Sequence, residues 1–154
     1  MAQTPVQTYL HELELTRNQI LETVNGLTDD QLHWQLGEDY NSVAMLIKHL
    51  TGSEKFWIGE VVGGIPSERN RAAEFTHDRP ARADLVNGWL RAKEQTHAVL
   101  GKMPAGALDE EVEYGSPNDR KRTTKRWVVV HVVAHTGYHL GQIRLLAKMA
   151  QRAK

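Results

Sequence analysis

The feature that most constrains this fold is a proline-free stretch of about 25 residues that begins near Thr124 and runs to about Lys148. Its valines at 128–130 and 132–133 would suit a β-strand, because β-branched residues are enriched in strands. A typical strand, however, has only about 5–6 residues. The stretch also repeats a helical period of three or four, at Val128, His131, His135, Tyr138, Gln142, Leu145 and Met149. We therefore predict one long helix.

Three further helices are predicted from capping residues and apolar periodicity. The first opens at Thr4–Pro5, where Gln7 completes a capping-box pattern, and it ends near Gly26. The second extends from a serine cap over about residues 42–62, and the third covers about residues 82–100. Glycine or proline follows both of these segments and ends them.

Four amphipathic helices of roughly 20 residues, with no convincing strand, predict an all-α four-helix bundle that forms a single domain over residues 1–154. The connections are about 15, 19 and 22 residues long, which exceeds those of simple up-and-down bundles. The middle connection, over residues 63–82, is long enough to run the length of a helix and leave the second and third helices parallel.

Composition and charge exclude several classes of function. Nineteen acidic residues balance 19 basic ones, so no overall field attracts nucleic acid or an anionic membrane. No segment approaches the roughly 20 apolar residues that span a bilayer, and no signal peptide is visible. The absence of cysteine excludes disulfides, thiolate metal sites and a cysteine nucleophile. We expect a cytoplasmic protein without a membrane or nucleic-acid partner.

Histidine placement points to a metal site. His131, His135 and His139 follow an i, i+4, i+8 spacing, which puts them on a helical stripe about 80° wide. The same stripe carries Tyr138, Gln142 and Leu145, so we expect it to face the bundle interior. Two imidazoles one turn apart can hold one metal ion, but His131 and His139 are about 12 Å apart along the axis and cannot easily share it.

A third ligand must therefore come from another element, and His49 on the second predicted helix also points inward. The alternative is a set of core histidines that only form hydrogen bonds with their neighbours. Burying several imidazoles without a ligand is unfavourable, because each loses its hydration. A zinc peptidase is disfavoured, because the position after His135 is Thr136 and not the glutamate that serves there as general base.

Two segments, residues 42–57 and 127–143, resemble the DinB-like superfamily, which includes bacillithiol S-transferases and mycothiol-dependent maleylpyruvate isomerases. The His-x-Gly-Gln-Ile element at 139–143 makes the resemblance fairly specific, and the resemblance covers nearly the whole chain. It implies a four-helix bundle with a crossover between helices two and three. It also implies a metal ion held by His49, His135 and His139, with His131 outside the ligand set.

The resemblance leaves the branch and the thiol less defined. The mycothiol-dependent branch tends to carry glutamate where this chain has His135, which favours the branch that resembles bacillithiol transferases and general DinB proteins.

Three neutral imidazoles leave a coordination position open for water or for a thiol. Because the chain has no cysteine, a sulfur nucleophile would come from a cosubstrate. Our leading hypothesis is a metal-dependent S-transferase that joins a low-molecular-weight thiol to an electrophile. The alternatives are a hydrolase that uses a metal-bound water and a non-catalytic, stress-associated metal-binding protein. Zinc and nickel suit the ligands best, and iron and copper are also compatible.

Two further groups of residues have open roles. Tyr138 and Gln142 either form hydrogen bonds around the metal and substrate or simply pack. A basic run before the last helix either binds an anionic cofactor or forms a solvated loop, and it contains Arg120, Lys121 and Arg122. The run would overhang the metal if the second and fourth helices started at the same end of the bundle. The wide apolar face of the second helix favours a homodimer.

Overall fold

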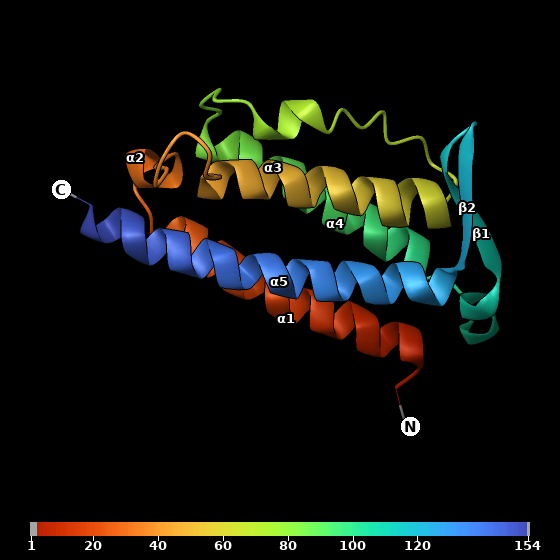
Figure 1. The fold of residues 1–154 in the computed structure, drawn as a ribbon. Helices are drawn as coiled ribbons and strands as arrows, with labels where there is room; N and C mark the ends of the chain where they lie inside the picture. The colour runs from red at the N-terminus through yellow and green to blue at the C-terminus, as the bar shows by residue number, and fades with distance from the viewer. Residues whose placement is uncertain (1–2, 154) are drawn as a thin grey trace.

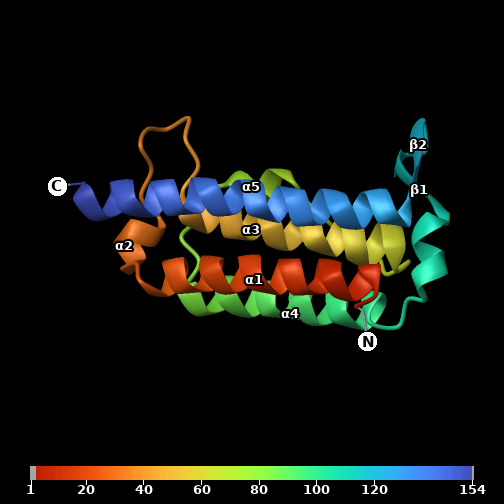
Figure 2. The same cartoon turned by 90° about the horizontal axis from the view of Figure 1, so that it is seen from below.

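The computed structural model describes residues 3–153, which form a bundle of long helices (Figures 1 and 2). The long helices are α1 (Pro5–Asn25), α3 (Val43–Glu54) with its continuation η1 (Lys55–Val62), α4 (Arg82–Leu100) and α5 (Lys125–Arg152). A two-stranded hairpin lies at the end of the bundle where α5 begins (Figure 1). Within residues 3–153, no helix is both long enough and apolar enough to cross a membrane.

The connection between η1 and α4 determines the topology. It returns along the length of the bundle and contains the short helix η2 (Ala72–Phe75), so α3 and α4 run in the same direction (Figure 1). Helices α1 and α5 run in the opposite direction. The crossover bundle expected from the sequence is therefore confirmed.

Helix starts follow the caps that the sequence predicts. The Thr4 hydroxyl accepts the N–H of Gln7, whose side-chain oxygen accepts the N–H of Thr4, so the capping box is complete. The hydroxyls of Ser42 and Thr124 accept the N–H of Met45 and Trp127 and so cap α3 and α5, without the reciprocal bond of a capping box. The last helix continues to Arg152, a short distance beyond its predicted end.

The prediction of a chain without strands is wrong. β1 (Glu111–Ser116) pairs antiparallel with β2 (Asp119–Thr124), and the basic run lies on β2 and not in a loop. Most of the hairpin's residues are exposed, so little apolar alternation marks the strands in the sequence. Gly115 permits the turn, because it has φ 102° and an added Cβ would lie 2.3 Å from the backbone oxygen of Asp119. A short helix, α2 (Asp29–Leu32), was also not predicted.

The buried face of α5 differs from the predicted stripe. Tyr138 is 64% exposed and Leu145 is 60% exposed, so the expectation that both face the interior is wrong. The face that packs in the core is rotated about the helix axis relative to the predicted stripe. Its buried residues are Val128, Val129, Val132, Thr136, His139, Ile143, Ala147 and Ala150. His131 and His135 therefore lie half-buried at the margin of the core, whereas His139 is buried.

The wide apolar face of α3 is buried against other helices of the same chain. Its residues from Val43 to Leu50 are buried apart from Lys48, most of them in one core cluster with α1, α4 and α5. The sequence argument for a homodimer relied on this face, which therefore supplies no dimer surface.

A buried ion pair joins α1 to α3. Arg17 and Glu54 are 2% and 3% exposed, and the guanidinium donates to the Glu54 carboxylate, which also accepts from the Thr96 hydroxyl of α4. Arg17 also donates to Glu14 over 2.7 Å. Removing one partner of such a pair leaves an uncompensated charge in the core, which destabilises a protein by about 3–5 kcal/mol.

Glu14 provides a pH test of the contact between α1 and α4. Burial raises the pKa of its carboxyl group, but hydrogen bonds from Lys93 and His97 and the charge of Arg17 outweigh this and lower the pKa from 4.5 to about 2. The stabilisation is therefore present above pH 4.5 and is lost as the pH falls towards 2. We expect Glu14→Gln to lower the free energy of unfolding by about 1 kcal/mol at neutral pH, after solvent screening, and to flatten its pH dependence. Urea unfolding of the parent protein and the variant at neutral pH and at low pH measures this difference. An equal loss of stability in Glu12→Gln, which changes an exposed glutamate of the same helix, would contradict it.

Candidate metal centre

Three histidine side chains from two helices converge between α3 and α5. Nε2 of His135 lies 3.0 Å from Nε2 of His49 and 3.0 Å from Nε2 of His139. One ring nitrogen from each histidine falls within 4.8 Å of the others, and this group can hold a metal ion. His49 and His139 are buried and His135 is half-buried. The antiparallel course of α3 and α5 brings His49 opposite the two histidines that are one turn apart on α5.

The outer ring nitrogens show which way the rings are protonated. Nδ1 of His49 lies 2.8 Å from a carboxylate oxygen of Glu74, and Nδ1 of His139 lies 2.6 Å from the amide oxygen of Gln142. Both partners are acceptors, so each Nδ1 carries the hydrogen and each Nε2 presents a lone pair to the centre. At most one proton, on His135, then lies among three nitrogens that are in contact. A cation at this point satisfies all three lone pairs, and the residues therefore fit a divalent metal ion.

His135 and His139 on α5 are also in the uncharged form that metal binding requires. Burial, together with the charges of the neighbouring imidazoles, lowers the pKa of His135 to about 3. Burial also lowers the pKa of His139, although its bond to Gln142 acts in the opposite direction. Both rings are neutral at pH 7, and the neutral imidazole is the form that binds metal.

Glu74 comes from η2 in the crossover connection and is held by Arg69. Arg69 Nε lies 2.6 Å from one carboxylate oxygen and Nη2 lies 3.0 Å from the other. Burial raises the pKa of the Glu74 carboxyl, but the bonds from His49 and Arg69 outweigh this effect and lower it. The sequence analysis missed both residues, because the connection has no periodicity that relates them to His49.

Gly52 makes room for this carboxylate. A Cβ at Gly52 would lie 2.2 Å from Oε1 of Glu74, so any larger residue at this turn of α3 must displace Glu74. Gly52 belongs to residues 42–57, one of the two segments that carry the family resemblance, and its contact with Glu74 gives a physical reason for glycine there.

His131 lies outside the convergent group. Its ring stacks on His135 with centroids 5.7 Å apart and on Trp127 with centroids 5.0 Å apart. Trp57 packs edge-on against it at 5.0 Å. Within residues 3–153, no hydrogen bond holds Nδ1 of His135, so this stack supports the His135 ring on the side away from His139 and His49.

The other residues singled out in the sequence lie at different distances from the centre. Gln142 contacts His139 directly, and its amide nitrogen donates to the Tyr138 hydroxyl over 3.1 Å. Arg120 and Arg122 both donate to Glu113 across the hairpin at 2.9 Å, and Lys121 pairs with Asp119. Helices α3 and α5 begin at opposite ends of the bundle (Figure 1), so the condition under which the basic run overhangs the metal is not met.

The ligand set is tested by four substitutions. We expect His49→Ala, His135→Ala and His139→Ala each to abolish tight binding of a divalent ion, because each removes one of three coordinating nitrogens. His131→Ala should keep one ion per chain and weaken its binding about tenfold at most, since it removes only support. Elemental analysis and titration of untagged protein measure both quantities. Retention of the ion in His139→Ala and its loss in His131→Ala would move the ligand set by one helical turn.

The role of Gly52 is tested by adding a single methyl group. We expect Gly52→Ala to weaken metal binding about tenfold or more, because it displaces the Glu74 carboxylate that fixes the His49 ring. Gly88→Ala on α4 is the matched control, since its Cβ would meet no atom closer than 3.9 Å. Both changes favour the helix by a similar amount. Equal metal affinities in the two variants would refute this role for Gly52.

A family model described as mycothiol-S-transferase matches residues 8–149. A search of curated proteins finds no match.

A conserved protein from Enterococcus faecalis has a similar structure, with a TM-score of 0.77 and 14% identity, covering 99% of this chain and 100% of that one. A DinB-like protein from Bacillus cereus has a TM-score of 0.75 and 14% identity, covering 98% and 95%. A DinB-like protein from Bacillus subtilis has a TM-score of 0.70 and 18% identity, covering 96% and 94%.

Proposed function

Because the chain belongs to the mycothiol-S-transferase family, within the DinB-like superfamily, we propose that it is a metal-dependent S-transferase that joins a low-molecular-weight thiol to an electrophile. The observation that carries this proposal is the convergence of three imidazole nitrogens on one point. The family match does not support the expectation, drawn from His135, that the chain lies nearer the bacillithiol transferases. Mycothiol is therefore the first thiol to test.

We assign His49, His135 and His139 as the ligands of the metal ion. A divalent ion held by three neutral imidazoles keeps an open position and lowers the pKa of a thiol or water that binds there. Zinc or nickel is the ion we propose, and iron or copper would use the same ligands. Glu74 and Gln142 keep the lone pairs of His49 and His139 directed at the ion by accepting their outer N–H groups.

The cosubstrate supplies the nucleophile, and an exposed side chain beside the site supplies a hydrogen-bond donor. The chain has no cysteine, so the sulfur nucleophile belongs to the cosubstrate. In the transfer, the thiol gives its proton to solvent and its sulfur forms a bond to the electrophilic carbon. With a chloroarene the carbon–chlorine bond breaks and chloride leaves; with an activated double bond the neighbouring carbon takes up a proton. The exposed Tyr138 hydroxyl accepts a hydrogen bond from Gln142 and keeps its own proton free to donate to a substrate.

A thiol-consumption assay tests the function. We expect loss of mycothiol in the presence of a generic electrophile, 1-chloro-2,4-dinitrobenzene, to require both protein and metal. Bacillithiol and glutathione are compared under the same conditions. His135→Ala should reduce the rate at least 100-fold, because it removes a metal ligand, and the exposed His11→Ala serves as control.

Other outcomes of this assay favour the rival functions. Ester hydrolysis without added thiol would support a hydrolase that uses a metal-bound water. Tight metal binding with neither reaction, for all three thiols, would support a non-catalytic metal-binding protein.

A further inference from the structure

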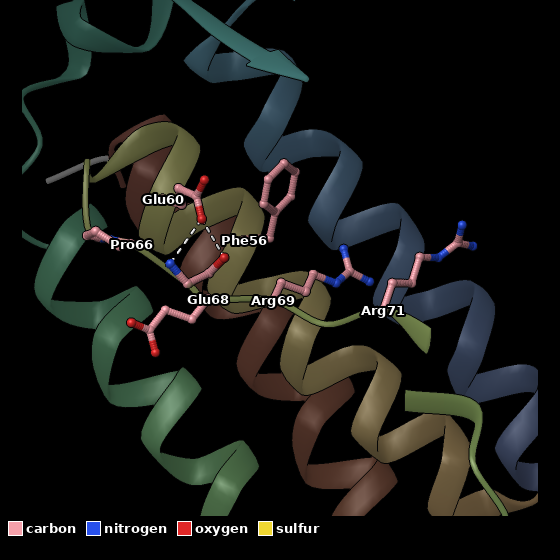
Figure 3. Close-up of a pocket in the computed structure, with 7 residues that line it drawn as sticks. Phe56, Glu60, Pro66, Glu68, Arg69 and Arg71 are labelled. Carbon is pink, nitrogen blue, oxygen red and sulfur yellow. Dashed lines mark hydrogen bonds between the residues drawn. The ribbon is translucent and has the colours of Figure 1, made fainter. Parts of the chain in front are cut away.

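A groove beside η1 has no role in the function proposed so far. A cavity of about 480 Å³ lies between η1 and the crossover connection, and its wall includes Phe56, Glu60, Arg69 and Arg71 (Figure 3). A smaller cavity of about 170 Å³ shares Phe56 and Glu60 and continues to Tyr114 of the hairpin. Together they form one groove along the outside of the bundle.

The groove reaches the metal centre through Arg69. This side chain is only 15% exposed, and two of its nitrogens are held by Glu74. Its Nη2 lies 3.5 Å from Nδ1 of His49, and its guanidinium lies 5.9 Å from the centroid of the Phe56 ring. Within residues 3–153, Nη1 of Arg69 has no hydrogen-bond partner, so one edge of a fixed guanidinium is free to donate.

Arg71 adds a second guanidinium on the same side. In Figure 3 the side chains of Arg69 and Arg71 both extend towards α5, the direction in which the Phe56 ring also points. Arg71 is exposed, and among residues 3–153 it forms no ion pair. One wall of the groove therefore presents two cationic forks beside an aromatic ring.

Two carboxylates line the same groove, but among residues 3–153 neither forms an ion pair with Arg69 or Arg71. Glu60 accepts the N–H of Ser67 over 2.9 Å and also accepts from the Ser67 hydroxyl, so its carboxylate is held against the connection. Glu68 points away from the two guanidinium groups (Figure 3). Glu68 also has φ 48°, in the left-handed region that a non-glycine residue rarely adopts. Such strain is typical of segments that serve a function.

We propose that this groove binds the electrophile and that Arg69 and Arg71 hold a carboxylate group on it. The acceptor would thus be a flat, carboxylate-bearing molecule. A guanidinium fork matches the two oxygens of a carboxylate, and the face of Phe56 suits a planar carbon skeleton. The role of the groove as the electrophile site rests on the proposed transferase function. Binding of a carboxylate there requires neither a thiol nor turnover.

The test uses a binding probe and its neutral analogue. Cinnamate and cinnamamide have the same skeleton and differ in charge. We expect cinnamate to bind the full chain at least tenfold more tightly than cinnamamide, in metal-free as well as metal-loaded protein. Arg71→Gln should weaken cinnamate binding about tenfold and leave cinnamamide binding and metal content unchanged. Arg79→Gln, an exposed arginine of the same connection that pairs with Asp30, is the matched control.

Three results would overturn the proposal. They are equal binding of the acid and the amide, equal effects of Arg71→Gln and Arg79→Gln, and cinnamate binding that requires the metal. The last would show that the carboxylate coordinates the ion and not the guanidinium groups. Because binding is measured without thiol, failure of the transferase assay with retained cinnamate binding would refute only the proposed function.

Discussion

The close approach of three imidazole nitrogens between α3 and α5 is the constraint on which the rest of the site depends. Nitrogens 3.0 Å apart, with few protons among them, are well placed to share one cation, and convergence of this kind needs each ring to keep its orientation. The rings must therefore be held in place from outside. The crossover connection supplies Glu74 for this purpose, and an up-and-down bundle with a short connection would have no segment there. The unusual topology and the chemistry of the site are thus linked.

Helix α3 carries buried polar groups on two of its faces, and each has partners from other elements. On one face His49 is bound by Glu74, which is bound by Arg69. On another face Glu54 accepts from Arg17 of α1 and from a hydroxyl of α4. Paired and hydrogen-bonded groups of this kind fix one register of neighbouring helices, because a shift by one turn leaves a charge unpaired in the core. The core pair therefore helps to keep α3 in the position that the metal centre requires.

Local patterns in the sequence were sufficient for the four long helices and insufficient for the long-range contacts. The capping box at Thr4 and the periodicity of α5 depend on residues three or four apart, so they could be read directly. The same holds for the spacing of His135 and His139. Glu74 lies in an irregular connection and meets His49 only after the chain has crossed over. The hairpin was missed because its strands are short and mostly exposed. The exposure of Tyr138 was missed because the apolar period of α5 does not specify which edge of the stripe the other helices cover.

The charge balance of the site connects the metal centre to the groove beside it. Three neutral imidazoles leave the full charge of a divalent ion uncompensated in its coordination shell. Glu74 contributes one negative charge behind His49, but Arg69 returns a positive one within hydrogen-bonding distance. In the centre and the adjoining wall, Arg69 and Arg71 supply two positive charges and Glu60, Glu68 and Glu74 supply three negative ones, so a net positive charge would come from a bound divalent ion. Such a field stabilises a thiolate relative to its thiol and attracts an anionic acceptor to the same place. A site with a carboxylate in place of one histidine would carry one more negative charge, so in the proposed metal site His135 would matter for the electrostatics as well as for coordination.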